Sequence, residues 1–255
     1  MKKILWNEMT MNEIGALDKE KTVIIVPTGA IEGHGPHLQV DCDSFNVTEL
    51  AKRVALACQE QGINAVVIPT LQFGYSEWMN YPGKISLRSK TFRSVVWDVC
   101  KSIVDNGFRK IIILNGHGGN PNFLAITAQE FYQEYKVIIP IIDYLRISAD
   151  IIDEVIETSF RHADEGETSV SLALGMDIDM KKATKEVPYM PHEIPKAKDV
   201  LGAPQKVIIP LTKITERCKS GVMGDATKAT KEKGEKIVQT VIERTVEFIK
   251  SFLQY

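Results

Sequence analysis

The sequence predicts an α/β fold with three layers, α/β/α, around a mainly parallel sheet. Short runs rich in β-branched residues recur along the chain, and stretches of helical length with one apolar face lie between them. Parallel strands that are covered on both faces are apolar throughout, and helices usually connect them. The 255 residues are 44% apolar and 25% charged, as in an ordinary globular protein. We therefore expect a single domain over residues 1–255.

The individual elements follow from these patterns. The expected strands are the apolar runs at 22–29, 64–71, 110–116 and 136–144. Helical periodicity predicts helices over 44–61, 91–105, the region near 147–158, and the tail 225–255. Asn120 followed by Pro121 predicts one more helix, with Asn as its N-cap.

One region breaks the alternation of strands and helices. Residues 181–211 contain five prolines and no regular period. This composition predicts an excursion over the surface. Because so long a loop usually has a role, we expect it at a subunit contact or over the mouth of the site.

Charge and cysteine content exclude several classes of protein. The net charge of −2 argues against non-specific nucleic-acid binding, which requires a basic field. The four cysteines are widely spaced and form no CxxC pair, so we expect reduced thiols rather than a disulfide framework or a zinc knuckle. No apolar stretch is long enough to cross a membrane, and the first residues do not resemble a signal peptide. The prediction is a cytoplasmic protein without a nucleic-acid or membrane partner.

Polar residues able to bind metal gather after the expected strands, where open α/β sheets place their ligands. In the first cluster, residues 30–43, Glu32 and His34 lie two apart and leave one face of an extended segment. Asp43 stands at the entry to the next helix, where a carboxylate can bridge two cations. Taken singly, these residues also fit a Gly/His-rich turn, with Asp43 as an N-cap and His37 as a hydrogen-bonded side chain.

Two further clusters follow. His117 lies within NGHGGN (115–120), which lacks the lysine and the spacing of a phosphate-binding loop. In RHADEGETS (161–169), His162 and Glu167 precede a short apolar helix. Asp164 and Glu165 are expected to be solvated acids of the helix start, and Glu167 is the candidate functional residue.

The three clusters together resemble the creatininase (creatinine amidohydrolase) family, as do residues 73–87 (FGYSEWMNYPGKISL) and 220–234 (SGVMGDATKATKEKG). The resemblance implies a creatininase-like α/β/α domain that binds two divalent metal ions per subunit, usually in a homo-hexamer. Glu32, Asp43 and His117 would hold one ion. His34 and the bridging Asp43 would hold the other.

The sequence departs from creatininase proper at Gly118 and Gly119, where that enzyme has a tyrosine and then a glutamate that binds the second metal. Glu167 is the candidate to complete the second site instead. The missing tyrosine contacts creatinine, so its loss favours the GHGGN branch of the family. That branch includes formamide-cleaving deformylases and other ring-opening hydrolases.

The residue types agree with this chemistry. Two cations that share a water can lower its pKa to about 7 and direct hydroxide at a carbonyl carbon. Ligation by His and carboxylate suits Zn²⁺, Mn²⁺ or Fe²⁺ and does not choose among them. We expect His162 and Glu167 to contribute to catalysis, with His162 either carrying a proton to the leaving nitrogen or orienting a ligand. The expected wall of the substrate pocket is formed by Ser76, Glu77 and Trp78.

The sequence thus predicts a dinuclear-metal hydrolase that cleaves a C–N amide bond of a small cyclic amide or formamide. One alternative is C–C hydrolysis of a cyclic diketone of the oxidised-inositol type, at the same site. Another is a non-catalytic binding protein with the same fold. A nucleotide-binding protein is the weakest alternative, because no phosphate-binding motif is present.

Overall fold

A parallel sheet forms the middle layer of the computed structural model, which describes residues 2–158, 162–187 and 214–255. Within these residues the main sheet has the order β2-β1-β3-β4. Its strands are β1 (Thr22–Thr28), β2 (Asn64–Val67), β3 (Lys110–Asn115) and β4 (Ile141–Asp143), and every neighbouring pair is parallel. The predicted fold class is confirmed.

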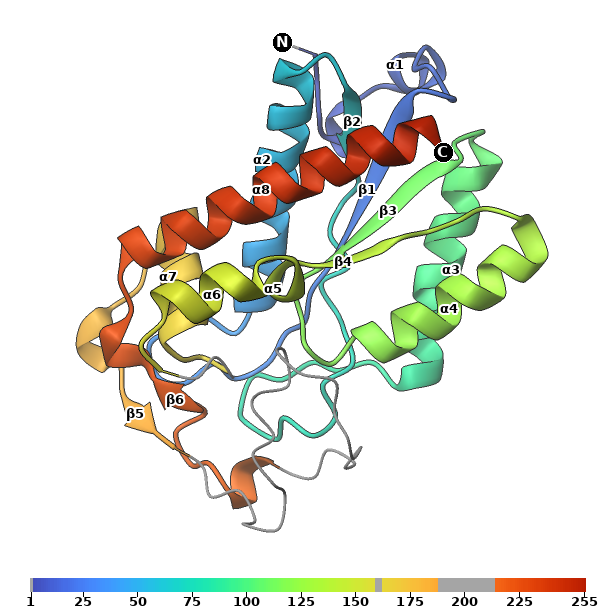
Figure 1. Cartoon of the computed structure of the whole chain (residues 1–255). Coiled ribbons are helices and arrows are strands. Elements are labelled where there is room, and N and C mark those ends of the chain that lie inside the picture. Colours follow the sequence, from blue (N-terminus) through green and yellow to red (C-terminus); the bar gives the residue numbers. More distant parts are fainter. Residues whose placement is uncertain (1, 159–161, 188–213) are drawn as a thin grey trace.

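Helices cover both faces of this sheet (Figure 1). Along β1 the side chains alternate: Val23 and Ile25 join one apolar cluster, Ile24 and Val26 the other. The first cluster includes α2 (Cys42–Glu60), α6 (Ala149–Val155), α7 (Glu165–Leu174) and α8 (Lys231–Gln254). The second includes α3 (Ser89–Asp105) and α4 (Pro121–Tyr135). Strands buried on both faces explain the continuous apolar runs in the sequence.

Shorter elements complete the described chain. α1 (Met11–Gly15) precedes the first strand, and α5 (Tyr144–Ile147) follows β4 directly. β5 (Lys185–Glu186) pairs antiparallel with β6 (Gly224–Asp225). The 3-10 turns η1 (Trp6–Glu8), η2 (Met180–Lys182), η3 (Ile214–Glu216) and η4 (Ala226–Lys228) lie in the connections. No helix among the described residues is long and apolar enough to span a membrane.

Several expected boundaries are wrong, for identifiable reasons. The run 64–71 pairs only as far as Val67, shortly before Pro69, and the run 136–144 pairs only from Ile141, just after Pro140. Helical structure near 147–158 is divided into α5 and α6. The tail becomes helical only at Lys231, because Thr230 caps α8 by accepting from the Lys233 N–H. Of the Pro-rich excursion, residues 188–211 lie outside the described residues.

The close contact between α7 and α8 depends on Gly234. A Cβ at Gly234 would overlap the Ser169 carbonyl and would lie 2.9 Å from the Ala173 Cβ. The Thr230 N–H also donates to the Ser169 hydroxyl at 3.1 Å. Since α7 carries Glu167, this contact helps to locate a predicted site residue.

We expect Gly234→Ala to destabilise the protein by about 1–3 kcal/mol, because overpacking against backbone outweighs the gain in helix propensity of about 1 kcal/mol. The measurement is the urea midpoint of unfolding. Gly15→Ala is the matched control, since a Cβ at Gly15 meets nothing within 4 Å. Equal stability of Gly234→Ala and wild type would contradict the packing argument.

Candidate metal centre

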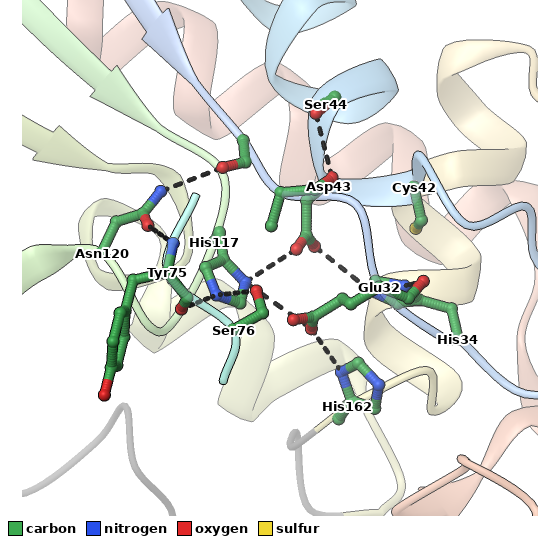
Figure 2. A network of polar contacts seen from close by, with 12 residues as sticks. Glu32, His34, Cys42, Asp43, Ser44, Tyr75, Ser76, His117, Asn120 and His162 are labelled. Carbon is green, nitrogen blue, oxygen red and sulfur yellow. Dashed lines mark hydrogen bonds and ion pairs between the residues drawn. The ribbon is translucent and has the colours of Figure 1, made fainter. Parts of the chain in front are cut away.

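Four of the predicted ligands, Glu32, His34, Asp43 and His117, converge at the carboxyl ends of the strands (Figure 2). Glu32 and His34 follow β1, His117 follows β3, Asp43 lies in the first turn of α2, and Glu167 lies in the first turn of α7. All five side chains are buried, and none is more than 5% exposed. The sequence predicted that Glu167 precedes this helix, but in the structure it lies within α7.

Each site histidine donates one ring N–H to a backbone carbonyl. His34 Nδ1 is 3.1 Å from the Glu32 carbonyl oxygen, and His117 Nε2 is 3.0 Å from that of Tyr75. His162 Nε2 is 2.9 Å from the Gly33 carbonyl oxygen. A carbonyl accepts only, so in the neutral form of each ring the second nitrogen is the atom with the lone pair, and it faces the carboxylates. This is the arrangement by which proteins orient histidine ligands.

Asp43 lies between two groups of ligand atoms. Its Oδ2 is 2.7 Å from His117 Nδ1, and its Oδ1 is 3.2 Å from His34 Nε2. Glu32 Oε1 lies 3.6 Å from His117 Nδ1, and Glu167 Oε2 lies 3.6 Å from His34 Nε2. Ligand atoms of Glu32, Asp43 and His117 lie within 4.8 Å of one another, and the same holds for His34, Asp43 and Glu167. Both groups therefore have the composition and compactness of a metal site, with Asp43 common to them.

Several atoms in this centre are buried without a hydrogen-bond partner. They are Glu32 Oε2, Asp43 Oδ2 and His34 Nε2. The His117–Asp43 pair is close, yet Asp43 Oδ2 does not accept a well-aligned hydrogen bond. Donor atoms that converge without bonding to one another fit a cation placed between them, because buried polar groups otherwise pair.

The pKa values reflect three buried carboxylates in one place. Burial raises the pKa of Glu167 to about 8, with Asp43 adding to the shift, and burial also raises the pKa of Glu32. Burial disfavours the charged form of His34, but Asp43 and Glu167 outweigh it and raise its pKa to about 10.

The other two histidines differ from each other. Burial opposes charge on His117, yet Glu32 and Asp43 raise its pKa to about 9. Burial and the neighbouring His34 lower the pKa of His162 to about 3, so its ring is neutral. The buried carboxylates favour the charged forms of His34 and His117. The His162 ring is neutral instead, so its Nδ1 keeps a lone pair.

His162 lies beside both ligand groups. Its Nδ1 is 3.6 Å from Glu32 Oε1 and 3.9 Å from Glu167 Oε2, and its ring centroid is 4.4 Å from that of His34. The Met223 N–H donates to the His162 carbonyl at 2.9 Å. The next residue, Ala163, has φ +48 and donates its N–H to Glu167 Oε2 at 2.5 Å. A left-handed conformation at a non-glycine residue is costly and is typical of functional sites.

Two predicted features of this segment are wrong. Asp164 and Glu165 are fully buried instead of solvated. The Asp164 side chain caps α7 by accepting from the N–H groups of Gly166 and Glu167. Glu165 accepts from the backbone N–H groups of Glu157 and Thr158 and pairs with Lys233. Both acids are therefore structural groups of the helix start.

The three residues predicted to form the wall of the substrate pocket differ in burial. Ser76 is fully buried, and its Oγ lies 3.1 Å from His117 Nε2 and donates to Glu32. Ser76 therefore contacts two of the candidate ligands. Glu77 is exposed, and the half-buried Trp78 stacks on His117 with ring centroids 5.8 Å apart.

Sequence reasoning missed the support of the His117 loop. Asn115 donates to the His117 carbonyl at 2.8 Å and to Asp143 Oδ2 at 2.9 Å. Asn120 occupies the N-cap position of α4 but makes no capping bond. Its side chain instead donates to the Gly29 carbonyl and accepts from the Tyr75 N–H. The two asparagines at the ends of NGHGGN, each next to a glycine, were the available signal.

Comparison with known proteins places this geometry in a family. The chain matches the creatininase family, described as creatinine amidohydrolase, over residues 7–249. It is 29% identical to the 3-dehydro-scyllo-inosose hydrolase of Thermotoga maritima, over 98% of this chain and 84% of that protein. It is 27% identical to the creatinine amidohydrolase of Pseudomonas putida, over 98% and 97% of the two chains. A solved structure described as "Creatininase Mn" superposes with a TM-score of 0.81 at 25% identity, covering 98% of each chain.

Gly119 has no room for a side chain. A Cβ there would lie 2.5 Å from His117 Nε2 and still closer to Trp78 Cη2 and the Tyr75 carbonyl oxygen. At Gly118 a Cβ would meet nothing within 4 Å. Trp78 thus occupies the volume that a side chain at position 119 would need.

We expect Gly119→Ala to displace Trp78 or His117 and to weaken Zn²⁺ binding by about 10–100-fold, as the loss of a ligand's support typically does. Competition with a chromophoric chelator measures the affinity. Gly118→Ala is the control and should bind as wild type does. Equal affinity in both variants would mean that His117 tolerates the shift.

Proposed function

Because the chain belongs to the creatininase family of hydrolases, we propose that it uses two divalent cations to cleave a C–N amide bond of a small cyclic amide or formamide. The observation that carries this proposal is the double role of Asp43. Its two carboxylate oxygens face different histidines, His117 and His34. One carboxylate between two ligand groups is the arrangement expected of a dinuclear centre.

The residues fit the two cations as follows. Glu32, Asp43 and His117 would hold the first, and His34, Asp43 and Glu167 the second. Nitrogen and carboxylate donors without thiolates suit Zn²⁺, Mn²⁺ or Fe²⁺. When bound, such a pair of cations activates water and polarises a carbonyl group.

His162 would carry the proton that the leaving nitrogen needs. Its Nε2–H is committed to the Gly33 carbonyl, so Nδ1 is the atom that accepts and returns a proton. That atom lies between one carboxylate of each ligand group. Ser76 would hold Glu32 and His117 in place, while Glu77 and Trp78 would contact substrate at the edge of the site.

The alternative reaction is C–C hydrolysis of a cyclic diketone. The relative named as 3-dehydro-scyllo-inosose hydrolase favours this reaction. Here a carbanion would leave, and it too would need a proton. The hypothesis of a non-catalytic binding protein is the least favoured, because it does not explain why five candidate ligands and His162 converge.

A substrate panel tests the proposal. Enzyme reconstituted with Zn²⁺, Mn²⁺ or Fe²⁺ is incubated with lactams, formamides and cyclic 1,3-diketones, and product formation is followed by mass spectrometry. Turnover of amides alone supports C–N cleavage, and turnover of diketones alone supports the alternative. No turnover of any class by fully loaded enzyme would favour the binding protein.

Asp43→Ala should lose both cations, because its carboxylate serves both groups. Elemental analysis after reconstitution is expected to give close to two ions per chain for the wild type and fewer for Asp43→Ala than for any other single ligand variant. Glu32→Ala is the comparison, as Glu32 belongs to only one of the two groups that share Asp43. Retention of two ions in Asp43→Ala would refute the shared role.

Substitutions of His162 and of Glu167 should have different effects on metal content and turnover. Glu167→Gln is expected to lower occupancy of the second cation, because a neutral amide is a poorer donor than a carboxylate. His162→Asn should keep both cations and slow turnover by about 10²–10⁴-fold, the usual range for general acid–base groups. Metal content and the rate on the best substrate of the panel are measured together. Near-normal turnover by His162→Asn would contradict the proton-transfer role and would indicate that His162 only orients a ligand.

We further propose a homo-hexamer located in the cytoplasm. The four cysteines all lie within the described ranges and are buried and free, as expected in a reducing compartment. Light scattering would test the assembly against six times the 28.5 kDa of one chain.

A further inference from the structure

Buried hydrogen bonds join α2 to α7 in a polar contact made by Cys42, Asn46 and Ser171, called here the α2–α7 contact. The Asn46 amide of α2 donates to the Ser171 hydroxyl of α7 at 2.9 Å. The Cys42 thiol lies 3.3 Å from the same hydroxyl, which itself donates to the Glu167 carbonyl at 3.0 Å. All three side chains are fully buried. The Ser171 hydroxyl therefore connects Asn46 directly to the backbone of Glu167.

The α2–α7 contact lies one helical turn from two candidate ligands of the second cation. Asn46 follows Asp43 by three residues on α2, and Ser171 follows Glu167 by four residues on α7. Residues three or four apart lie on the same side of a helix. Because Asp43 and Glu167 both belong to the first turns of their helices, the contact fixes how far apart those first turns stand.

A second hydrogen bond connects the loop of the third ligand of this group to α7. His37 Nε2 lies 2.9 Å from the Thr168 hydroxyl, and both residues are buried. His37 follows His34 by three residues, and Thr168 follows Glu167 directly. The segments that carry His34, Asp43 and Glu167 are therefore all joined by hydrogen bonds to α7, the helix that completes this group.

The other ligand group is built differently. Glu32 and His117, which share Asp43 with the first cation, follow the strands β1 and β3. The parallel pairing of these two strands holds their ends side by side. A change in the α2–α7 contact should therefore affect the second ligand group and leave the first in place.

One atom of the α2–α7 contact indicates that it does not serve stability alone. Asn46 Oδ1 is buried without a hydrogen-bond partner. Such an acceptor costs free energy of folding, and apolar groups of the same shape in place of both partners would avoid this cost. A hydrogen bond also has a preferred distance and direction, which an apolar contact lacks. The polar pair thus provides geometry at some expense of stability.

We propose that Asn46 and Ser171 are positioning residues that set the affinity for the second cation through Glu167. This inference rests on the proposed two-cation function. The hydrogen bonds hold the first turn of α7 at a fixed separation from Asp43, so that both carboxylates meet one cation. Without these bonds the helices still pack, but Glu167 is held less well and the second cation binds more weakly.

The test combines Asn46→Leu with Ser171→Ala in one double variant. Leucine has the branching and the number of heavy atoms of asparagine, so both partners become apolar with little change of shape. The urea midpoint of the metal-free variant is expected to equal or exceed that of the wild type, because the unpaired Asn46 oxygen is gone. A contact with a purely structural role would instead lower that midpoint.

Metal affinity gives the second readout of the double variant. Competition with a chromophoric chelator measures the binding of two Zn²⁺ ions per chain. One ion should bind as in the wild type and the other about 10–100-fold more weakly, the usual effect of removing a group that orients a ligand. If circular dichroism shows that the double variant is unfolded, Ser171→Ala alone is used, with the same expectation for the two ions.

Ser169→Ala is the matched control. Ser169 is a second fully buried serine of α7, and its hydroxyl donates to the Glu165 carbonyl at 2.6 Å, just as that of Ser171 donates to Glu167. It accepts from the Thr230 N–H beside α8 and not from α2. The close approach of Gly234 involves the Ser169 backbone, so α7 keeps its place against α8. Ser169→Ala should therefore bind both ions as the wild type does.

Combination with Glu167→Gln shows whether the contact acts through Glu167. Glu167→Gln alone should weaken one ion, and adding the double variant should weaken that ion little further, because residues that act as a unit are not additive. Wild-type affinity in the double variant, equal weakening of both ions, or full additivity with Glu167→Gln would overturn this inference alone. Wild-type affinity for both ions in Glu167→Gln would overturn the proposed second cation site itself.

Discussion

The burial of three carboxylates around one point is the constraint on which the site depends. Glu32, Asp43 and Glu167 are each at most 5% exposed. Charges buried this deeply must be neutralised or paired. In the chain alone, protons do part of this, since the pKa values of His34, His117 and Glu167 are raised to about 10, 9 and 8. Divalent cations would neutralise the same charges while displacing those protons.

The fold provides the rigidity that this arrangement needs. Parallel strands end at one edge, so β1 and β3 bring Glu32, His34 and His117 together from distant parts of the chain. α7 holds Glu167 through Asp164 and Ala163, and α8 presses against α7 at Gly234. His34, His117 and Glu167 each bond to a backbone group, and such contacts hold side-chain geometry better than a surface loop would.

Trp78 and the glycine at position 119 depend on each other, because the indole ring needs the space that a side chain at 119 would fill. The indole of Trp78 fills the space beside Gly119 and stacks on His117. A carboxylate at position 119 could not coexist with that ring. In the proposed centre the second ligand group is completed from α7 by Glu167, 48 residues later in the chain. The two arrangements are alternatives in packing, and they leave different shapes beside the ligands for a substrate.

The sequence by itself determined the α/β class and most of the strand and helix cores, which follow from local apolar runs and helical periodicity. The motifs that resemble the creatininase family named the candidate ligands, including Glu167, and the structure brings these residues into two compact groups. Prediction from the sequence was wrong about the lengths of two strands, which prolines shorten near Pro69 and Pro140. It was also wrong about Asp164 and Glu165, which were expected in solvent and are buried.

Only the tertiary structure decided which nitrogen of His117 and of His162 faces the carboxylates. The carbonyl that accepts from His117 belongs to Tyr75, 42 residues away, and the carbonyl that accepts from His162 belongs to Gly33, 129 residues away. It also decided that the Ser76 hydroxyl lies against His117, 41 residues later in the chain. Such contacts depend on distant segments packing against one another, and no local pattern records them.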